Sequence, residues 1–263
     1  MQITSILRRA AQINPNGIAT IFEDRQNSWS QMLDRVRKLA GALQKLGMNP
    51  GDRVALLSLN SDRFMEYYFA TVWGGGAMMP MNVRWAAAEC AYALNDAGAE
   101  TLIVDEAFKG VAADIKPMVD GLKTLIYCGD AATPDGMLNY EDILAAADPA
   151  EDAGRSGDDL AGIFYTGGTT GFPKGVMLSH TNLLYAAVNW IASLHFTEET
   201  VFMHSAGFFH MAGSIPAFAL TLAGGTHVCL PKFDAELGMR IIQRHRVTYC
   251  LFVPTMINMM LNH

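Results

Sequence analysis

The sequence predicts an α/β protein with a largely parallel sheet, because short apolar runs alternate along the chain with segments of helical periodicity. Of the 263 residues, 51% are hydrophobic and 17% are charged, which is typical of a globular chain with a sizeable core. Residues 145–159 are rich in Ala, Asp, Pro and Gly, and we expect them to form a surface linker.

The clearest single element is a helix expected at residues 29–46. Its apolar side chains recur on one helical face, and Ser28 with Gln31 forms a capping-box pattern at its start. Gly47 follows as a C′ residue.

The other elements are assigned on the same grounds of periodicity, capping and chain-breaking residues. Further helices are expected at residues 3–13, 64–73, 85–94, 109–119, 183–194, 213–222, 235–244 (capped by Asp234) and from 254 onward. Strands are expected at residues 18–22, 53–59, 101–105, 124–128, 161–165, 201–206, 226–230 and 248–253, with a polar turn at 23–27.

A loop rich in Gly and Thr follows the strand at 161–165, and it leads through a Pro-Lys-Gly turn to an N-cap at Ser179. Glycines allow the backbone to approach a ligand closely, threonines donate hydrogen bonds, and a lysine adds positive charge. Such a set suits a polyphosphate. Its members are Thr166, Gly167, Gly168, Thr169, Thr170, Gly171 and Lys174. The segment is not a Walker A loop, because Pro173 and Gly175 occupy positions where that motif requires Gly and a hydroxyl. A P-loop NTPase is therefore disfavoured.

Residues 165–175 resemble the phosphate loop of the adenylate-forming acyl-CoA synthetases, usually Tyr-Thr-Ser-Gly-Thr-Thr-Gly-x-Pro-Lys-Gly. The one difference is Gly167, where that family usually has Ser. Weaker similarities to the same family follow in the expected order at residues 51–54, 77–84, 208–213 and 253–255.

The resemblance implies two α/β lobes packed side by side in αβαβα layers. Lobe one would comprise about residues 48–195, with the phosphate loop at 165–175, and lobe two about residues 1–47 plus 196–263. The family's later segments and its C-terminal domain have no counterpart in this sequence, so we expect an incomplete N-terminal domain whose final helix is cut in mid-element.

The resemblance also implies a reaction in which ATP adenylates a carboxylic acid and the acyl group passes to coenzyme A. The loop would hold the ATP phosphates, and Thr170 would help to hold Mg²⁺. His210 would border the carboxylate end of the acyl pocket, although it could instead be a core-edge histidine bonded to a backbone carbonyl. The remaining pocket residues would be Phe208, Phe209, Met211, Gly213, Thr255 and Met256, with plain core packing as the alternative for the apolar ones.

We expect the 263-residue fragment to be inactive alone and to self-associate. The alternative function is a non-catalytic nucleotide- or phosphate-binding module that a partner completes. The formal net charge of −7 without basic clusters argues against nucleic acid as a partner.

The cysteines Cys90, Cys128, Cys229 and Cys250 are widely spaced, which is typical of reduced thiols in a cytoplasmic protein. No signal peptide is visible. Residues 200–231 contain no charged side chain, but their histidines, proline and glycines favour a buried strand, helix and strand over a membrane span.

Overall fold

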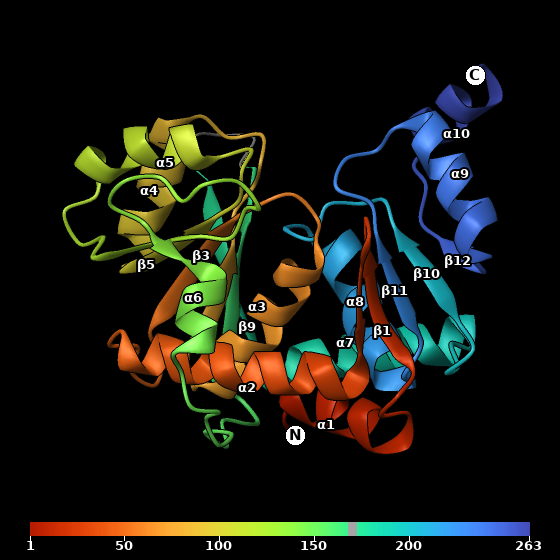
Figure 1. Cartoon of the computed structure of the whole chain (residues 1–263), viewed down its shortest axis with the longest axis horizontal. Helices are drawn as coiled ribbons and strands as arrows, with labels where there is room; N and C mark the ends of the chain where they lie inside the picture. The colour runs from red at the N-terminus through yellow and green to blue at the C-terminus, as the bar shows by residue number, and fades with distance from the viewer. Residues whose placement is uncertain (168–172) are drawn as a thin grey trace.

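The computed structural model describes residues 1–167 and 173–263 and contains two β-sheets that lie side by side (Figure 1). In the described part of the chain the larger sheet has the strand order β7-β6-β5-β3-β4-β8-β9. Its neighbours are parallel except for β8 and β9. The strands are β3 (Arg53–Leu57), β4 (Ala77–Pro80), β5 (Thr101–Val104), β6 (Thr124–Tyr127), β7 (Leu138–Asn139), β8 (Leu160–Thr166) and β9 (Lys174–Ser179).

The smaller sheet joins strands from both ends of the sequence, in the order β12-β10-β11-β1-β2. Its strands are β1 (Ile18–Phe22), β2 (Arg25–Ser28), β10 (Val201–His204), β11 (Thr226–Cys229) and β12 (Tyr249–Cys250). β1 runs parallel to β11, with Thr20 opposite His227, whereas β2 is antiparallel to β1. The sheets are therefore largely parallel, as predicted.

Helices form the layers between and outside the sheets. They are α1 (Thr4–Ile13), α2 (Trp29–Lys45), α3 (Asp62–Trp73), α4 (Ala87–Ala97), α5 (Lys109–Ile115), α6 (Tyr140–Ala145), α7 (His180–Leu194), α8 (Met211–Ala223), α9 (Ala235–His245) and α10 (Pro254–Leu261). Figure 1 shows α4 and α5 outside the larger sheet, α3 and α8 between the sheets, and α9 outside the smaller sheet. The αβαβα layering is confirmed.

The central strands of the larger sheet, β3, β4, β5, β6 and β8, contribute to two hydrophobic cores. Val54 and Leu56 point into the core that the two sheets share, whereas Ala55 and Leu57 point into the core beneath α4 and α5. This double burial explains why these strands are continuous apolar runs. α3 lies between the sheets and is buried along its whole length, so it has no solvent-exposed face.

The capping patterns predicted around α2 are confirmed. Ser28 Oγ accepts a hydrogen bond from the Gln31 N–H at 3.2 Å, and Gln31 Oε1 accepts one from the Ser28 N–H at 2.7 Å. Gly47 has a φ of +102°, which favours glycine just after a helix. α2 contacts α3 as well as β1 and β2, and Figure 1 shows it running below both sheets. The assignment of residues 1–47 to a second lobe stays a prediction.

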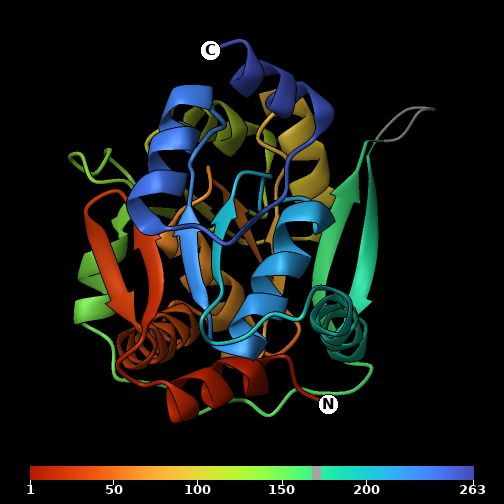
Figure 2. The same cartoon turned by 90° about the vertical axis from the view of Figure 1, so that its right-hand side faces the viewer.

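Four strands were not predicted, one of which is the two-residue β7. Residues 174–179 form β9, paired with β8 (Figure 2), whereas a turn was expected at 173–175. The polar residues 25–28 form the edge strand β2 within the segment expected to be a turn, and β4 is a four-residue strand ending in Pro80. Their sequences are polar, exposed or very short, so hydrophobic patterning does not indicate them.

Residues 200–231 fold as β10, α8 and β11, in agreement with the strand, helix and strand predicted there. In the described ranges no helix has both the length and the apolar character needed to cross a bilayer.

Candidate functional site

The first part of the predicted site is the open end of the β8–β9 hairpin. Thr166 and Lys174 face each other across the two strands, and both are exposed, as is Gly167. Lys174 forms no ion pair with any residue in the described ranges, so its charge can meet an anion. The predicted residues Gly168, Thr169, Thr170 and Gly171 lie outside the described residues.

The base of this hairpin is closely packed. The buried Tyr165 donates a hydrogen bond to Asp96 Oδ2 at 2.6 Å, which ties β8 to α4. Gly175 lies opposite Tyr165, and a Cβ there would come within 2.7 Å of the Ile163 side chain and 3.0 Å of the Tyr165 ring. Glycine is therefore required at position 175 for strand packing, and the exposed Thr166 and Lys174 are presented on a rigid base.

The second part of the predicted site follows the carboxyl end of β10. His210 is the N-cap residue of α8, and its Nδ1 accepts a hydrogen bond from the Ala212 N–H at 3.2 Å. In the neutral ring the proton is then on Nε2, and the side chain is exposed. This bond differs from the backbone-carbonyl contact considered as the alternative. Nε2 is available to donate to a ligand.

The residues beside His210 have unequal exposure. Phe208 is fully buried, and its ring packs against Phe64, Tyr68 and His204 with centroid distances of 5.3, 6.1 and 4.9 Å. Its side chain therefore belongs to the core instead of lining an open pocket. Phe209 is partly exposed, so it is the ring of this pair that a substrate can reach.

Two further predicted residues on α8 differ in role. Met211, at the start of the helix, is partly exposed. Gly213 is buried, and a Cβ there would lie 2.3 Å from the backbone oxygen of Gly207. Glycine at 213 therefore allows the first turn of α8 to contact the preceding loop.

The remaining predicted residues lie on α10. Thr255 is exposed and Met256 is partly exposed. α10 packs against α9, and no hydrogen bond recorded between described residues joins Thr255 or Met256 to residues 208–213. Their place in an acyl pocket stays a prediction.

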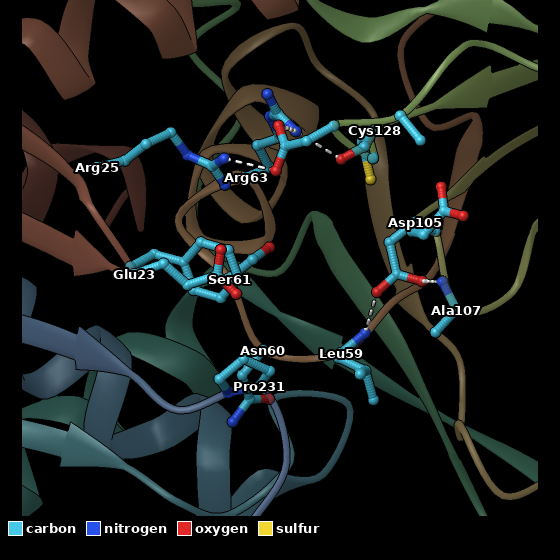
Figure 3. Close-up of a pocket in the computed structure, with 15 residues that line it drawn as sticks. Glu23, Arg25, Leu59, Asn60, Ser61, Arg63, Asp105, Ala107, Cys128 and Pro231 are labelled. Atoms are coloured by element: carbon cyan, nitrogen blue, oxygen red, sulfur yellow. Dashed lines mark hydrogen bonds and ion pairs between the residues drawn. The ribbon is translucent and has the colours of Figure 1, made fainter. Parts of the chain in front are cut away.

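A cavity of about 350 Å³ lies where the carboxyl ends of strands from both sheets meet (Figure 3). Its walls are the loops after β3, β5 and β6, the β1–β2 turn and Pro231. Asp105 closes one side by accepting hydrogen bonds from the N–H groups of Leu59 at 2.8 Å and Ala107 at 3.0 Å. Burial raises the pKa of Asp105 although these hydrogen bonds act in the opposite direction. None of the predicted site residues that the structure describes lines this cavity.

Arginines at the rim of the cavity join the two sheets. Arg25, on β2, donates two hydrogen bonds to the carboxylate of Asp62, from Nε and Nη2, each 2.9 Å long. Its Nη1 group donates to Asp130 Oδ2 at 2.7 Å. Arg63, on α3, also binds Asp130 at 2.8 Å. Partial burial acts to raise the pKa of Asp130, yet the hydrogen bond from Arg25 and the nearby charges keep it below its usual value. Because carboxylates compensate both guanidinium groups, these arginines fix the sheets relative to each other.

Comparison with known proteins identifies the family. The model of the AMP-binding enzyme family matches residues 7–263.

The chain belongs to the AMP-binding enzyme family.

Among the relatives of this AMP-binding chain is 2-succinylbenzoate–CoA ligase of Arabidopsis thaliana, which is 30% identical over 97% of the chain and 47% of the relative. Among solved structures, the anthranilate CoA ligase AuaEII in complex with anthranoyl-AMP superposes with a TM-score of 0.92 at 25% identity, covering 97% of this chain and 50% of that one. ATP-bound MatB from Rhodopseudomonas palustris has a TM-score of 0.86 at 31% identity, covering 100% and 52%. The chain spans about half the length of the curated relatives it matches.

The structure also contains a polar contact that the sequence analysis missed. Asn60, at the carboxyl end of β3, hydrogen-bonds the backbone of residues 204–208 from the smaller sheet. One signal was available, since Asn60 is a polar residue directly after a buried strand, where ligand-site residues of parallel sheets gather. Its partner segment, 144–148 residues away in sequence, could not be inferred from that signal.

Proposed function

We propose that the full-length protein containing this chain activates a carboxylic acid with ATP and transfers the acyl group to coenzyme A. The observation that carries the proposal is the exposed pair Thr166 and Lys174 at the open end of the β8–β9 hairpin, within a chain of the AMP-binding family. A hydroxyl and an uncompensated ammonium on a rigid base suit the phosphates of ATP.

The roles of the individual groups follow from the charge that develops. As the acid carboxylate attacks the α-phosphate of ATP, negative charge accumulates on the departing pyrophosphate, and Lys174 with Thr166 would stabilise it. His210 Nε2–H would donate to an oxygen of the acid. ATP and coenzyme A are the co-substrates, and Mg²⁺ is expected with ATP. Its proposed ligand Thr170 lies outside the described residues.

The acid is proposed to be apolar, either medium-chain or aromatic. Phe209 and Met211 offer partly exposed apolar surface beside His210, and neither adds a charge that would pair with a second carboxylate. The named relatives act on or bind acids of different kinds, such as 2-succinylbenzoate and anthranilate, so the choice of acid rests on this chain's own residues.

Acyl-CoA formation by the full-length protein tests the proposal. The protein would be incubated with ATP, Mg²⁺, coenzyme A and a panel of aryl, medium-chain, dicarboxylic and amino acids, and thioesters would be detected by mass spectrometry. We expect thioesters from apolar monocarboxylic acids. A preference for a dicarboxylate or an amino acid would contradict the proposed substrate class. ATP binding without any thioester would instead favour a non-catalytic nucleotide-binding module.

A further inference from the structure

The side chain of Asn60 connects the larger sheet to the loop that carries the proposed acid site. Its Nδ2 group donates to the backbone oxygens of His204 at 3.2 Å and Ala206 at 2.9 Å. Its Oδ1 accepts from the N–H of Phe208 at 2.7 Å. Asn60 is only 2% exposed, so both ends of the carboxamide are satisfied by this single segment of backbone.

Tyr68 provides a second point of attachment for the same segment. Its hydroxyl, on α3, donates to the backbone oxygen of Phe208. Both backbone groups of Phe208 are therefore hydrogen-bonded to side chains that follow β3 in the sequence. Asn60 accepts from the N–H, and Tyr68 donates to the C=O. The ring of Phe208 is fully buried and packs against Phe64 and Tyr68, and this packing is a third interaction that restrains the residue.

The next two residues are the partly exposed Phe209 and the exposed His210. A change in the backbone position of Phe208 must move Phe209 directly, since one peptide unit joins them. It also alters the entry to α8, because His210 is the N-cap of that helix. Asn60 additionally forms part of the wall of the 350 Å³ cavity at the carboxyl ends of the sheets (Figure 3).

We propose that Asn60 is a positioning residue that sets the place of Phe209 and His210 in the acid site; this inference rests on the proposed function. An asparagine is suited to the task because it offers two N–H donors to two carbonyls and one acceptor to one N–H. Aspartate has the same shape, but it would direct carboxylate oxygens at the carbonyls of His204 and Ala206 and lose both donated bonds.

Asn60→Asp in the full-length protein tests this directly through acid-dependent ATP–pyrophosphate exchange. We expect the KM for the acid to rise about tenfold or more and the KM for ATP to change less than about twofold, because the substitution displaces only the acid-site loop. Tyr68→Phe removes the second attachment and should raise the acid KM in the same direction. It keeps the proposal testable if Asn60→Asp does not fold.

Tyr67→Phe is the matched control. Tyr67 precedes Tyr68 on α3, is equally buried, and hydrogen-bonds Val54 and Met79 within the larger sheet. The Tyr67→Phe variant should lower the stability of the fold without a selective change in the KM for the acid. If Asn60→Asp and Tyr68→Phe affect the acid and ATP KM values equally, or match Tyr67→Phe, the positioning role is wrong.

Hydrogen exchange separates this inference from the proposed function. In Asn60→Asp, exchange of the Phe208 N–H should be about tenfold faster or more, because its acceptor is displaced. Absence of acid-dependent ATP–pyrophosphate exchange in the wild-type protein would overturn the proposed function and with it the role of Asn60 in acid binding. An unchanged exchange rate at Phe208 would overturn the attachment itself, whatever the activity.

Discussion

His204 and His227 form a hydrogen bond of 2.9 Å between Nε2 and Nδ1 inside the core of the smaller sheet. Both side chains are fully enclosed, and His227 Nε2 lies 3.2 Å from the hydroxyl of Thr221. That hydroxyl donates to the backbone oxygen of Ala217. It therefore accepts from His227 Nε2–H, and the bond between the two rings needs one nitrogen that accepts, so the two rings cannot both be protonated.

Acid should therefore destabilise the fold through this pair. Burial lowers the pKa of His227 to about 3 and that of His204 well below its usual value. The unfolded chain takes up protons on these residues below pH 6.5 and the folded chain does not, so stability is lost as the pH falls from 6.5 towards 3. His227 contributes up to about 1.4 kcal/mol per pH unit within that window, and His204 adds a loss of stability in the same direction.

Urea unfolding of wild type and His227→Gln at several pH values measures this effect. The variant should lose stability less steeply than wild type between pH 6 and 4, by up to about 1.4 kcal/mol per pH unit. Parallel curves for wild type and His227→Gln would contradict the account.

Gly213→Ala should destabilise the protein by about 1–3 kcal/mol, since the added Cβ would meet the Gly207 backbone oxygen at 2.3 Å and neither backbone can move freely. Gly110→Ala is the matched control. Gly110 lies in α5 with nothing within 4 Å of the added Cβ, so alanine there should be neutral or stabilising by up to about 1 kcal/mol. Thermal unfolding distinguishes the two. Equal effects would show that the contact with Gly207 does not constrain position 213.

Much of the fold could be predicted because the larger sheet is buried on both faces. Residues 54–57 and 102–104 are continuous apolar runs, and α2, which precedes them, carries the capping box of Ser28. β9 could not be predicted in the same way. Its side chains are mostly exposed, and it forms because it pairs with β8, a tertiary interaction that local patterning does not contain.

The candidate site was predictable only where a motif identified it. Thr166 and Lys174 are exposed, in agreement with a ligand-binding role. The sequence could not predict which of the adjacent residues Phe208 and Phe209 is buried, because both are phenylalanines in the same segment. The structure distinguishes them, since Phe208 packs beneath α3. The role of Asn60 depends on a contact between the two sheets, and no local pattern specifies that contact.

Lys174→Ala in the full-length protein should weaken the use of ATP by roughly 10- to 150-fold, because one charge-assisted contact to phosphate contributes about 1.5–3 kcal/mol. The exposed Lys45, at the end of α2, is the matched control and its replacement should have no effect. Steady-state kinetics with varied ATP measures the loss. Unchanged ATP kinetics in Lys174→Ala would show that the hairpin end is only a turn.

Residues 1–263 alone should self-associate and form no acyl-adenylate. Ile257, Met259 and Leu261 on α10 are 45%, 53% and 80% exposed, and β9 and β12 are edge strands of the described sheets. Size-exclusion chromatography with light scattering at micromolar concentration measures the association. The charged variant Met259→Lys with Leu261→Lys should reduce it. A monomeric wild-type fragment, or one that adenylates an acid, would contradict this prediction.

The central claim is that the full-length protein joins a carboxylic acid to AMP before thioester formation. Exchange of radiolabelled pyrophosphate into ATP, measured without coenzyme A, tests it most directly. The account predicts exchange that requires both Mg²⁺ and an apolar monocarboxylic acid and that falls in Lys174→Ala. Exchange that is absent with every acid, or that proceeds equally well without one, would contradict it.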